Sequence, residues 1–411
     1  MTSSLETADG PDGSTARAGA GPRAGRLPSL TGMRFLCAAM VFGLHSALMM
    51  FFSNPGTSEK YMGAVTQGGF TGVVYFFILS GFVLTWSARS GDRLGAFWRR
   101  RFFKIYPNYL VALVLGVVLA VYVQGQVFDR KSGLLDVLLI QSWSNNLNTR
   151  TSFNLPHWSL SCEALFYLCF PLLLWLINKV RPERLWAGAI AVIAAIFAVP
   201  VVSHFLPYNE VYPGGSHDTD IWLTLHFPAT RMLDFVLGIF MARIVMTKRR
   251  LPLGLGGAVA LTAAAYWLGS YVPERFTMVS LTVIPLALVI AAAANEDSAG
   301  RPSLVSGRVW VWLGEISYAF YLLHYLVLAY ARHLLGTRTF SGPVTFALLI
   351  GLFLITIVAS AALHHFVERP MMKHFSQSRR GRSVAPAAEL PAEPTFADEN
   401  RPHAVADHRA A

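Results

Sequence analysis

Ten apolar runs, each about as long as a bilayer is thick, dominate the sequence. A membrane helix needs about 20 mostly apolar residues, and such runs lie near 33–52, 70–88, 105–124, 159–178, 185–203, 229–246, 251–270, 278–294, 313–335 and 344–367. The apolar stretch 133–143 is too short to span, so we expect it to lie in or on the membrane interface. The pattern predicts an all-α integral membrane protein with about ten transmembrane helices.

The distribution of basic residues predicts how these helices are oriented. With the N-terminus in the cytoplasm, fourteen Lys and Arg residues fall in the inner loops and six in the outer loops. The outer stretch 204–228 contains neither residue type. Cytoplasmic loops carry an excess of Lys and Arg, so this asymmetry predicts that the N- and C-termini are cytoplasmic. A crossing at 133–143 would invert every later loop.

The composition supports membrane insertion. The chain is 54% hydrophobic and 14% charged, with a mean hydropathy of +0.45, whereas soluble domains are roughly 25% charged. The net charge of +11 comes from arginines beside apolar runs, which indicates membrane orientation and argues against a nucleic-acid partner. The three cysteines lie in apolar runs without metal-ligand spacing, and we interpret them as small packing residues. The sequence therefore predicts a multi-pass protein of the cell membrane.

Two polar ends flank the predicted membrane domain at 31–370. Residues 1–30 are rich in Gly, Ala, Ser, Pro and Arg, without an apolar core and cleavage site, which predicts a disordered cytoplasmic leader. Residues 371–411 have the composition of a disordered cytoplasmic tail and are too few for a second domain.

The first apolar run carries two ionisable residues on one helical face. Arg34 and His45 are eleven positions apart, which is three turns plus about 20° and roughly 16 Å along a helix. His45, halfway along the predicted span, can serve as a general base, or it can bond a neighbouring helix. Arg34 can face a substrate, or it can extend its side chain to the cytoplasmic surface. Ionisable groups within a membrane segment are costly and point to function.

A second group of polar residues lies at the outer end of the fourth predicted span. It begins at His157; Glu163 lies about one turn into the span, and Tyr167 lies one turn further on the same face. A buried carboxylate needs a partner, and we hypothesise that Glu163 orients His45; the alternative is a structural salt bridge. Ser161 is a candidate nucleophile, although serine in membrane helices more often bonds the helix backbone.

A basic cluster precedes the third span and a polar aromatic stripe runs along the ninth. The cluster consists of Arg99, Arg100, Arg101 and Lys104; it can hold the phosphates of a cytosolic donor, or it can serve only as an orientation signal.

The stripe in the ninth span includes Tyr318, with His324 beside it, either as part of a site or as ordinary packing. Arg231 and Asp234, three residues apart in the sixth span, predict an intrahelical ion pair. The run ending at Pro370 predicts that the last span ends there.

These stretches together resemble the integral-membrane acyltransferase-3 family of O-acyltransferases, over about residues 27–372. The features that match are Arg34 and His45 at their spacing, Phe77-Ile-Leu-Ser-Gly-Phe82, the basic run ending Tyr106-Pro107, Trp158-Ser-Leu-Ser-Cys-Glu163, Ile316-Ser-Tyr-Ala-Phe-Tyr-Leu-Leu-His324 and Glu368-Arg-Pro370. The stretch before the first span, Leu27-Pro-Ser-Leu-Thr-Gly-Met-Arg34, is most similar to that of the actinomycete macrolide O-acyltransferases. His157 and Cys162 depart from the family pattern, and we expect the chain to differ from one branch of the family by lacking its extracytoplasmic hydrolase-like domain.

The resemblance implies an enzyme that moves a short acyl group from acyl-CoA to a hydroxyl of a macrolide or other natural-product glycoside. It implies His45 as the catalytic histidine, Arg34 as its partner in the motif and Glu163 as a further essential acid. Acyl-CoA is then a co-substrate, with no permanently bound cofactor or metal. We expect His45 to deprotonate the acceptor directly and Tyr318 or His324 to bond the developing oxyanion.

Two other functions stay open at this point. Within the family, an O-acetyltransferase of cell-envelope polysaccharide or glycolipid would need an acceptor path from outside. A polytopic transporter or flippase would also suit about ten helices with intramembrane charges, but it would be expected to show inverted repeats, and none is visible.

Overall fold

Most of the chain that the structure describes is helical. The computed structural model describes residues 25–88, 91–208, 210–211, 217–301 and 303–375, which form helices and no sheet. Most of the predicted leader and tail lies outside these residues, but α1 begins at Pro28 and α15 ends at Phe375.

The longer helices are α1 (Pro28–Leu48), α2 (Pro55–Trp86), α3 (Leu94–Val117), α6 (Trp158–Asn178), α7 (Leu185–His204), α9 (Pro228–Met246), α10 (Leu255–Leu268), α12 (Ser280–Ser298), α13 (Arg308–Leu335) and α14 (Gly342–Leu363). The shorter ones are η1 (Val118–Val123), α4 (Arg130–Val137), η2 (Gln141–Trp143), α5 (Leu147–Arg150), η3 (Leu155–His157), η4 (Pro182–Arg184), α8 (Asp218–Ile221), η5 (Trp222–His226), η6 (Gly269–Tyr271), α11 (Glu274–Thr277), η7 (His364–Glu368) and α15 (Arg369–Phe375).

Every predicted span coincides with one of the longer helices. By length and composition, eight helices of the described chain can cross a membrane. The other two are α9, which carries Arg231, Asp234 and Arg243 within 19 residues, and α10, whose 14 residues reach only about 21 Å. The all-helical, multi-pass character is therefore confirmed, whereas the number of crossings and their orientation stay predictions.

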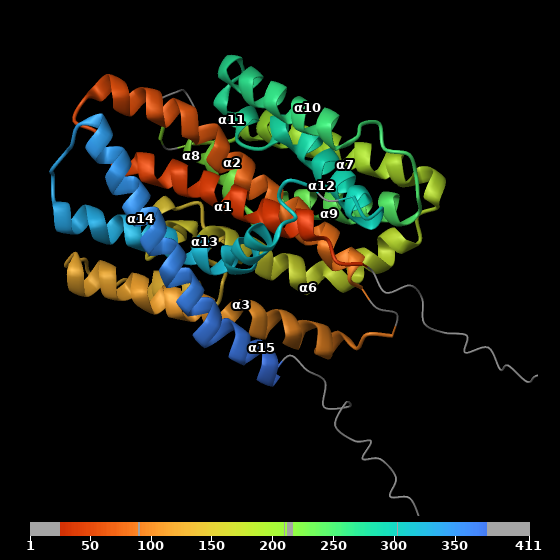
Figure 1. The fold of residues 1–411 in the computed structure, drawn as a ribbon, viewed down its shortest axis with the longest axis horizontal. Helices are drawn as coiled ribbons and strands as arrows, with labels where there is room; N and C mark the ends of the chain where they lie inside the picture. The colour runs from red at the N-terminus through yellow and green to blue at the C-terminus, as the bar shows by residue number, and fades with distance from the viewer. Residues whose placement is uncertain (1–24, 89–90, 209, 212–216, 302, 376–411) are drawn as a thin grey trace, which may run out of the picture. The chain divides into compact units, whose positions relative to one another are not determined.

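Helices α1 and α2 lie at the centre of the bundle. Figure 1 shows α1 beside α2 and α13, and α2 packs against α9 and α12 as well. Among the candidate spans, α2 and α12 bury most of their surface, while α7 and α14 bury little. Apolar helices that leave so much surface uncovered are suited to contact with lipid.

The start of α1 is held by other helices. Pro28 opens the helix, and the Asp297 carboxylate of α12 accepts bonds from the Ser29 backbone N–H (3.0 Å) and hydroxyl (2.5 Å). The first N–H groups of a helix have no partner within it, and an anion there also complements the helix dipole. On the other side, Gly314 of α13 lies so close that a Cβ on it would be 1.9 Å from the Thr31 carbonyl oxygen. These contacts fix the position of the first turn of α1, which leads to Arg34.

Helices α2 and α9 cross with their backbones in contact at two glycines. A Cβ built on Gly81 would lie 2.0 Å from the Phe235 carbonyl oxygen. In the reciprocal contact, a Cβ on Gly238 would lie 2.0 Å from the Ile78 carbonyl oxygen. Small residues allow membrane helices to approach this closely, and dispersion between the backbones then stabilises the pair.

Replacing Gly238 with alanine is expected to destabilise the protein by about 1–3 kcal/mol, because the added methyl group overpacks the α2–α9 crossing. The measurement is the thermal unfolding midpoint of the purified protein in detergent, followed by loss of the monodisperse peak on gel filtration. Gly351→Ala on α14 is the control, since nothing lies within 4 Å of its Cβ position and alanine favours helix. Equal midpoints for the two variants would contradict the prediction.

The segment between α3 and α6 continues from the apolar stretch 133–143 into the bundle. Leu134, Leu138 and Trp143 of that stretch stay exposed, and its interfacial position stays a prediction. The Gln141 side chain donates to the His157 carbonyl oxygen (2.9 Å), and Asn154 donates to the Leu322 carbonyl oxygen (2.9 Å) near the middle of α13. Arg150, one of the six Lys and Arg residues that the sequence places in outer loops, is only 1% exposed. Irregular backbone is tolerated at this depth because the protein itself satisfies its polar groups.

The end of the last span differs from the prediction as well. The chain does not stop before Pro370: α14 passes through the π-helical turn η7 and continues as α15. Pro370 is the second residue of α15, directly after η7. Because the helix is continuous there, the missing N–H leaves a carbonyl of the preceding turn without its helical donor, a local irregularity that a π-helical turn can accommodate. Such π-helical turns often occur at functional sites, and η7 borders the site described next.

Candidate active site

A narrow cavity of about 130 Å³ lies between five helices. It is lined by Arg34 from α1, Val73, Phe76, Phe77, Leu79, Ser80, Val83 and Leu84 from α2, Arg101, Lys104 and Ile105 from α3, Ser159, Leu160, Glu163 and Tyr167 from α6, and Ser317, Tyr318 and Tyr321 from α13. Most of the wall is apolar. The ionisable side chains therefore mark the part of the cavity that can bind a polar group.

Glu163 shares the narrow cavity with three cations. The Tyr167 hydroxyl, one turn along α6, donates a hydrogen bond to the Glu163 carboxylate, as the spacing predicts. Arg34, Arg101 and Lys104 line the same cavity, and among the described residues none of them is ion-paired with Glu163. The Arg101 Nε is buried without a hydrogen-bond partner. An excess of cations over acids makes this site suited to an anionic group.

A second, wider cavity of about 820 Å³ shares Arg34 and Lys104 with the first. Its other lining residues are Glu315 of α13 and His364, His365, Glu368, Arg369, Pro370, Met372, Lys373 and His374 of η7 and α15. Glu368 accepts hydrogen bonds from Asn108 of α3 (2.9 Å) and from His364 (3.1 Å). The π-helical turn thus positions the basic residues of α15 beside Arg34 and Lys104.

His45 pairs with His324, and this corrects the predicted contact between His45 and Glu163. His45 Nδ1 lies 2.7 Å from His324 Nε2, and the two rings stack with centroids 5.0 Å apart. His324 Nδ1 lies 3.2 Å from the Phe320 carbonyl oxygen, which accepts only, so we assign the proton of His324 to Nδ1. His324 Nε2 then accepts from His45 Nδ1, and His45 Nε2 is left as the nitrogen that can take a proton.

His45 also lies further along α1 than predicted. The span predicted at 33–52 is a helix that begins at Pro28 and ends at Leu48, so His45 is in its last turn. Met50, with a φ of 53°, turns the chain out of the helix just afterwards. The eleven positions between Arg34 and His45 correspond to about 16 Å along the helix axis. Arg34 lines both cavities, whereas His45 lies at the opposite end of α1.

Tyr321 lies between the narrow cavity and the histidine pair. It lines the cavity, and its ring centroid is 5.7 Å from that of His324. Its hydroxyl is 2.7 Å from the Ser159 hydroxyl and donates to the Pro156 carbonyl oxygen at 3.3 Å. Neither His45 nor His324 lines the two cavities. A group bound in the narrow cavity is thus one side chain away from the histidines.

The other predicted site residues are distributed unevenly. Arg101 and Lys104 line the narrow cavity, whereas Arg99 and Arg100 line neither cavity; Arg100 pairs with Asp92.

Ser161 is 1% exposed and lies outside both cavities, and Ser159 lines the wall in its place. Tyr318 lines the narrow cavity, and its hydroxyl donates to the Ile105 carbonyl oxygen at 3.0 Å. The ion pair predicted between Arg231 and Asp234 is confirmed at 2.7 Å, away from both cavities.

Comparison with known proteins decides the family. The family described as "Acyltransferase domain" matches residues 27–365. The chain belongs to this acyltransferase-3 family. It is 40% identical over 370 residues to Acyltransferase MdmB of Streptomyces mycarofaciens, covering 87% of this chain and 95% of that protein. No solved structure matches.

More distant relatives are longer proteins. The chain is 24% identical over 380 residues to peptidoglycan O-acetyltransferase OatA of Listeria monocytogenes, covering 85% of this chain and 56% of that protein. It is 24% identical over 334 residues to putative peptidoglycan O-acetyltransferase YrhL of Bacillus subtilis, covering 74% and 51%. The family predicted from the motifs is confirmed, and the protein is a membrane O-acyltransferase, which sets the transporter hypothesis aside.

Several buried polar residues of the acyltransferase escaped the sequence analysis. Gln141 and Asn154 hold the start of α6, and Arg150 donates from Nε to His226 Nδ1 at 3.0 Å. Asn108 binds Glu368. The one feature of the sequence that could have indicated a buried polar segment is the high density of polar residues between 141 and 157, directly after an apolar stretch. Only the tertiary structure reveals that this segment is buried.

Proposed function

We propose that this acyltransferase transfers a short acyl group from acyl-CoA to a hydroxyl of a macrolide or related natural-product glycoside at the cell membrane. We further propose ten transmembrane helices with both termini in the cytoplasm. The observation that carries the proposal is the pair of cavities that share Arg34 and Lys104. One is wide and basic, and the other is narrow and mostly apolar.

The two cavities match the two parts of an acyl-CoA. The wide cavity carries Arg369 and Lys373 in addition to the shared cations, and cations of this kind bind phosphate groups by charge-assisted hydrogen bonds. The narrow cavity suits a thin chain such as the pantetheine arm with its thioester. In the proposed topology Arg34 and α15 are on the cytoplasmic side, where acyl-CoA is available.

The histidine pair supplies the chemistry in this proposal. His45 Nε2 takes the proton of the acceptor hydroxyl while that oxygen attacks the thioester carbonyl. The carbon–sulfur bond then breaks and coenzyme A leaves as a thiolate. His324 holds the His45 ring in the tautomer that this step requires. Tyr318 lines the narrow cavity, but its hydroxyl donates to the Ile105 carbonyl oxygen. It would have to turn from that bond to stabilise the developing oxyanion. No covalent acyl-enzyme is needed.

Glu163 acts on the donor side in this proposal. With His324 as the partner of His45, Glu163 is free to hold the Tyr167 hydroxyl and to balance Arg34, Arg101 and Lys104 around the bound anion. Buried cations without an acid beside them would be costly.

The acceptor class rests on the relative with 40% identity, which the chain matches over 95% of its length. An envelope-glycan acceptor is the second candidate, because His45 lies in the last turn of α1, at the end away from Arg34. In the proposed topology that end faces outward. The relatives at 24% identity point the same way.

The test uses purified protein in detergent with a pool of short acyl-CoAs and a panel of macrolides, simple glycosides and glycan fragments. Mass spectrometry reads which acceptors gain an acyl mass and whether coenzyme A is released. We expect a gain on a macrolide or glycoside. A gain only on glycan fragments would replace the acceptor class, and the absence of acyl-CoA binding would overturn the donor.

A further inference from the structure

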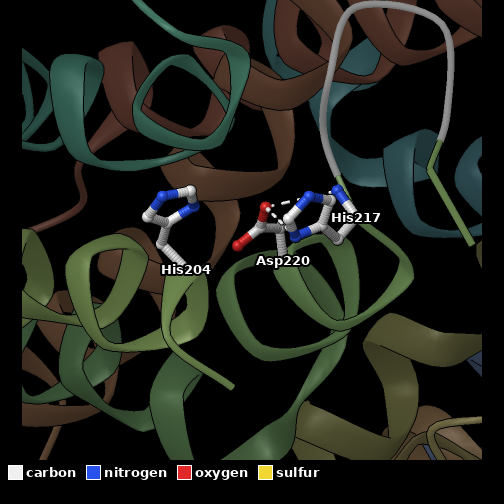
Figure 2. A group of neighbouring side chains, drawn as sticks. All are labelled: His204, His217 and Asp220. Atoms are coloured by element: carbon white, nitrogen blue, oxygen red, sulfur yellow. Dashed lines mark hydrogen bonds and ion pairs between the residues drawn. The ribbon is translucent and has the colours of Figure 1, made fainter. Parts of the chain in front are cut away.

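A group of three metal-ligating side chains lies outside the site just described. His204 is the last residue of α7, His217 directly precedes α8, and Asp220 lies within α8. One nitrogen of each histidine and one carboxylate oxygen all lie within 4.8 Å of one another. Figure 2 shows the two imidazoles on either side of the Asp220 carboxylate. None of the three lines either cavity, so the proposed reaction does not use them.

We propose that His204, His217 and Asp220 bind a transition-metal ion, with Zn²⁺ as the ion that best fits them. Two imidazoles and a carboxylate are ordinary zinc ligands, and bond lengths of about 2.0–2.2 Å put neighbouring ligand atoms about 3.3–3.5 Å apart in a tetrahedron. His217 Nδ1 and Asp220 Oδ2 are already 3.7 Å apart. His204 is exposed at a helix end, so its ring can turn inward.

The surroundings of Asp220 and His217 prepare them for a cation. The Ser203 hydroxyl donates to Asp220 Oδ1 (2.6 Å), and the His217 backbone N–H donates to Asp220 Oδ2 (3.2 Å). Hydrogen bonds of this kind orient ligands before the metal arrives. His217 Nδ1 is buried without a hydrogen-bond partner, and the Tyr208 ring stacks on the imidazole with centroids 3.6 Å apart. A metal ion would satisfy that nitrogen.

The charge of the segment also favours a cation. Residues 204–228 contain Glu210, Asp218 and Asp220 and no Lys or Arg. Because this stretch has no basic side chain, its acidic residues favour binding of a divalent ion.

The ion would link His204 at the end of α7 to His217 and Asp220 at the start of α8, with twelve residues between the two histidines. Helix α8 leads directly into η5, where Trp222 donates from Nε1 to the Ser142 carbonyl oxygen (3.1 Å) and His226 accepts from Arg150. These contacts hold the segment that enters the bundle before α6. The metal would thus have a structural role, stabilising the segment at the start of the helix that carries Glu163.

The test measures zinc binding by the intact protein, independently of acyl transfer. Protein without a polyhistidine tag is stripped with a chelator, and Zn²⁺ affinity is measured by competition with a chromophoric chelator, with metal content by mass spectrometry. We expect one equivalent per chain. His204→Ala should weaken affinity at least about 100-fold, and Ser203→Ala about 10–100-fold as an outer-shell loss.

His333→Ala is the matched control, because His333 is an exposed histidine in the last turn of α13 and lies outside the group. It should bind zinc like the unmodified protein. Zinc should also raise the thermal unfolding midpoint of the unmodified protein and not that of His204→Ala. Substoichiometric zinc, or equal affinity in His204→Ala and His333→Ala, would overturn the proposal, whatever the outcome of the acyl-transfer assay.

Discussion

Replacing His45 with alanine is expected to lower kcat by about 10²–10⁴-fold, the usual contribution of a positioned general base. The side chain is buried in the last turn of α1 and its Nδ1 lies 2.7 Å from His324 Nε2. Removing the ring removes the only nitrogen that this arrangement leaves able to accept the hydroxyl proton. The measurement is the rate of acyl transfer by the purified variant at saturating donor, with its gel-filtration profile compared with that of the unmodified protein.

Variants of His324 separate catalysis from positioning. His324→Ala leaves the His45 ring without its acceptor, so kcat should fall by about tenfold or more. His324→Gln retains an acceptor for His45 Nδ1 and should recover part of the rate, which a purely structural role would not predict. His333→Ala, on the same helix, should leave kcat unchanged. Normal turnover by His45→Ala would remove the base assignment.

Replacing Lys104 with methionine is expected to raise the KM for the acyl-CoA donor by about 10–100-fold, because a charge-assisted hydrogen bond contributes roughly 1.5–3 kcal/mol. Lys104 lines both cavities, so its ammonium is at the junction where we propose that the donor's charged and apolar parts meet. Methionine keeps the apolar stem and removes the charge. The measurement is the steady-state KM for each substrate separately.

The acceptor KM should change little in Lys104→Met, since the acceptor is expected near His45. Lys248→Met is the matched control, because Lys248 is an exposed lysine after α9 and lines neither cavity. An equal rise of both KM values, or the same effect in both variants, would show that Lys104 acts through folding or overall charge.

Local sequence patterns predicted most of the helices and the contacts within single helices. Runs of about 20 apolar residues have few alternatives to helices when their backbone polar groups must be satisfied internally, and all ten predicted ranges contain a helix. The i to i+4 relation placed Tyr167 on Glu163, and the i to i+3 relation paired Arg231 with Asp234. Both contacts lie within one helix, where sequence spacing alone sets the distance.

Helix ends and re-entry were harder to predict. Apolarity locates a span but does not locate its caps, so α1 was placed about four residues late, and His45 moved from the middle to the last turn. The π-helical turn η7 carries the chain past the expected stop before Pro370. The burial of Arg150 depends on partners such as His226, 76 positions away, which no local pattern contains.

The sequence by itself determined the class of protein, the positions of the helices and the family, because these follow from hydrophobic length and from motifs at fixed spacing. Only the tertiary structure decided the partners within the site. It paired His45 with His324 across 279 positions and left Glu163 with Tyr167. It also separated Arg101 and Lys104 from Arg99 and Arg100. Those outcomes depend on helix crossings such as Gly81 against Phe235, which are set by close packing between segments far apart in the chain.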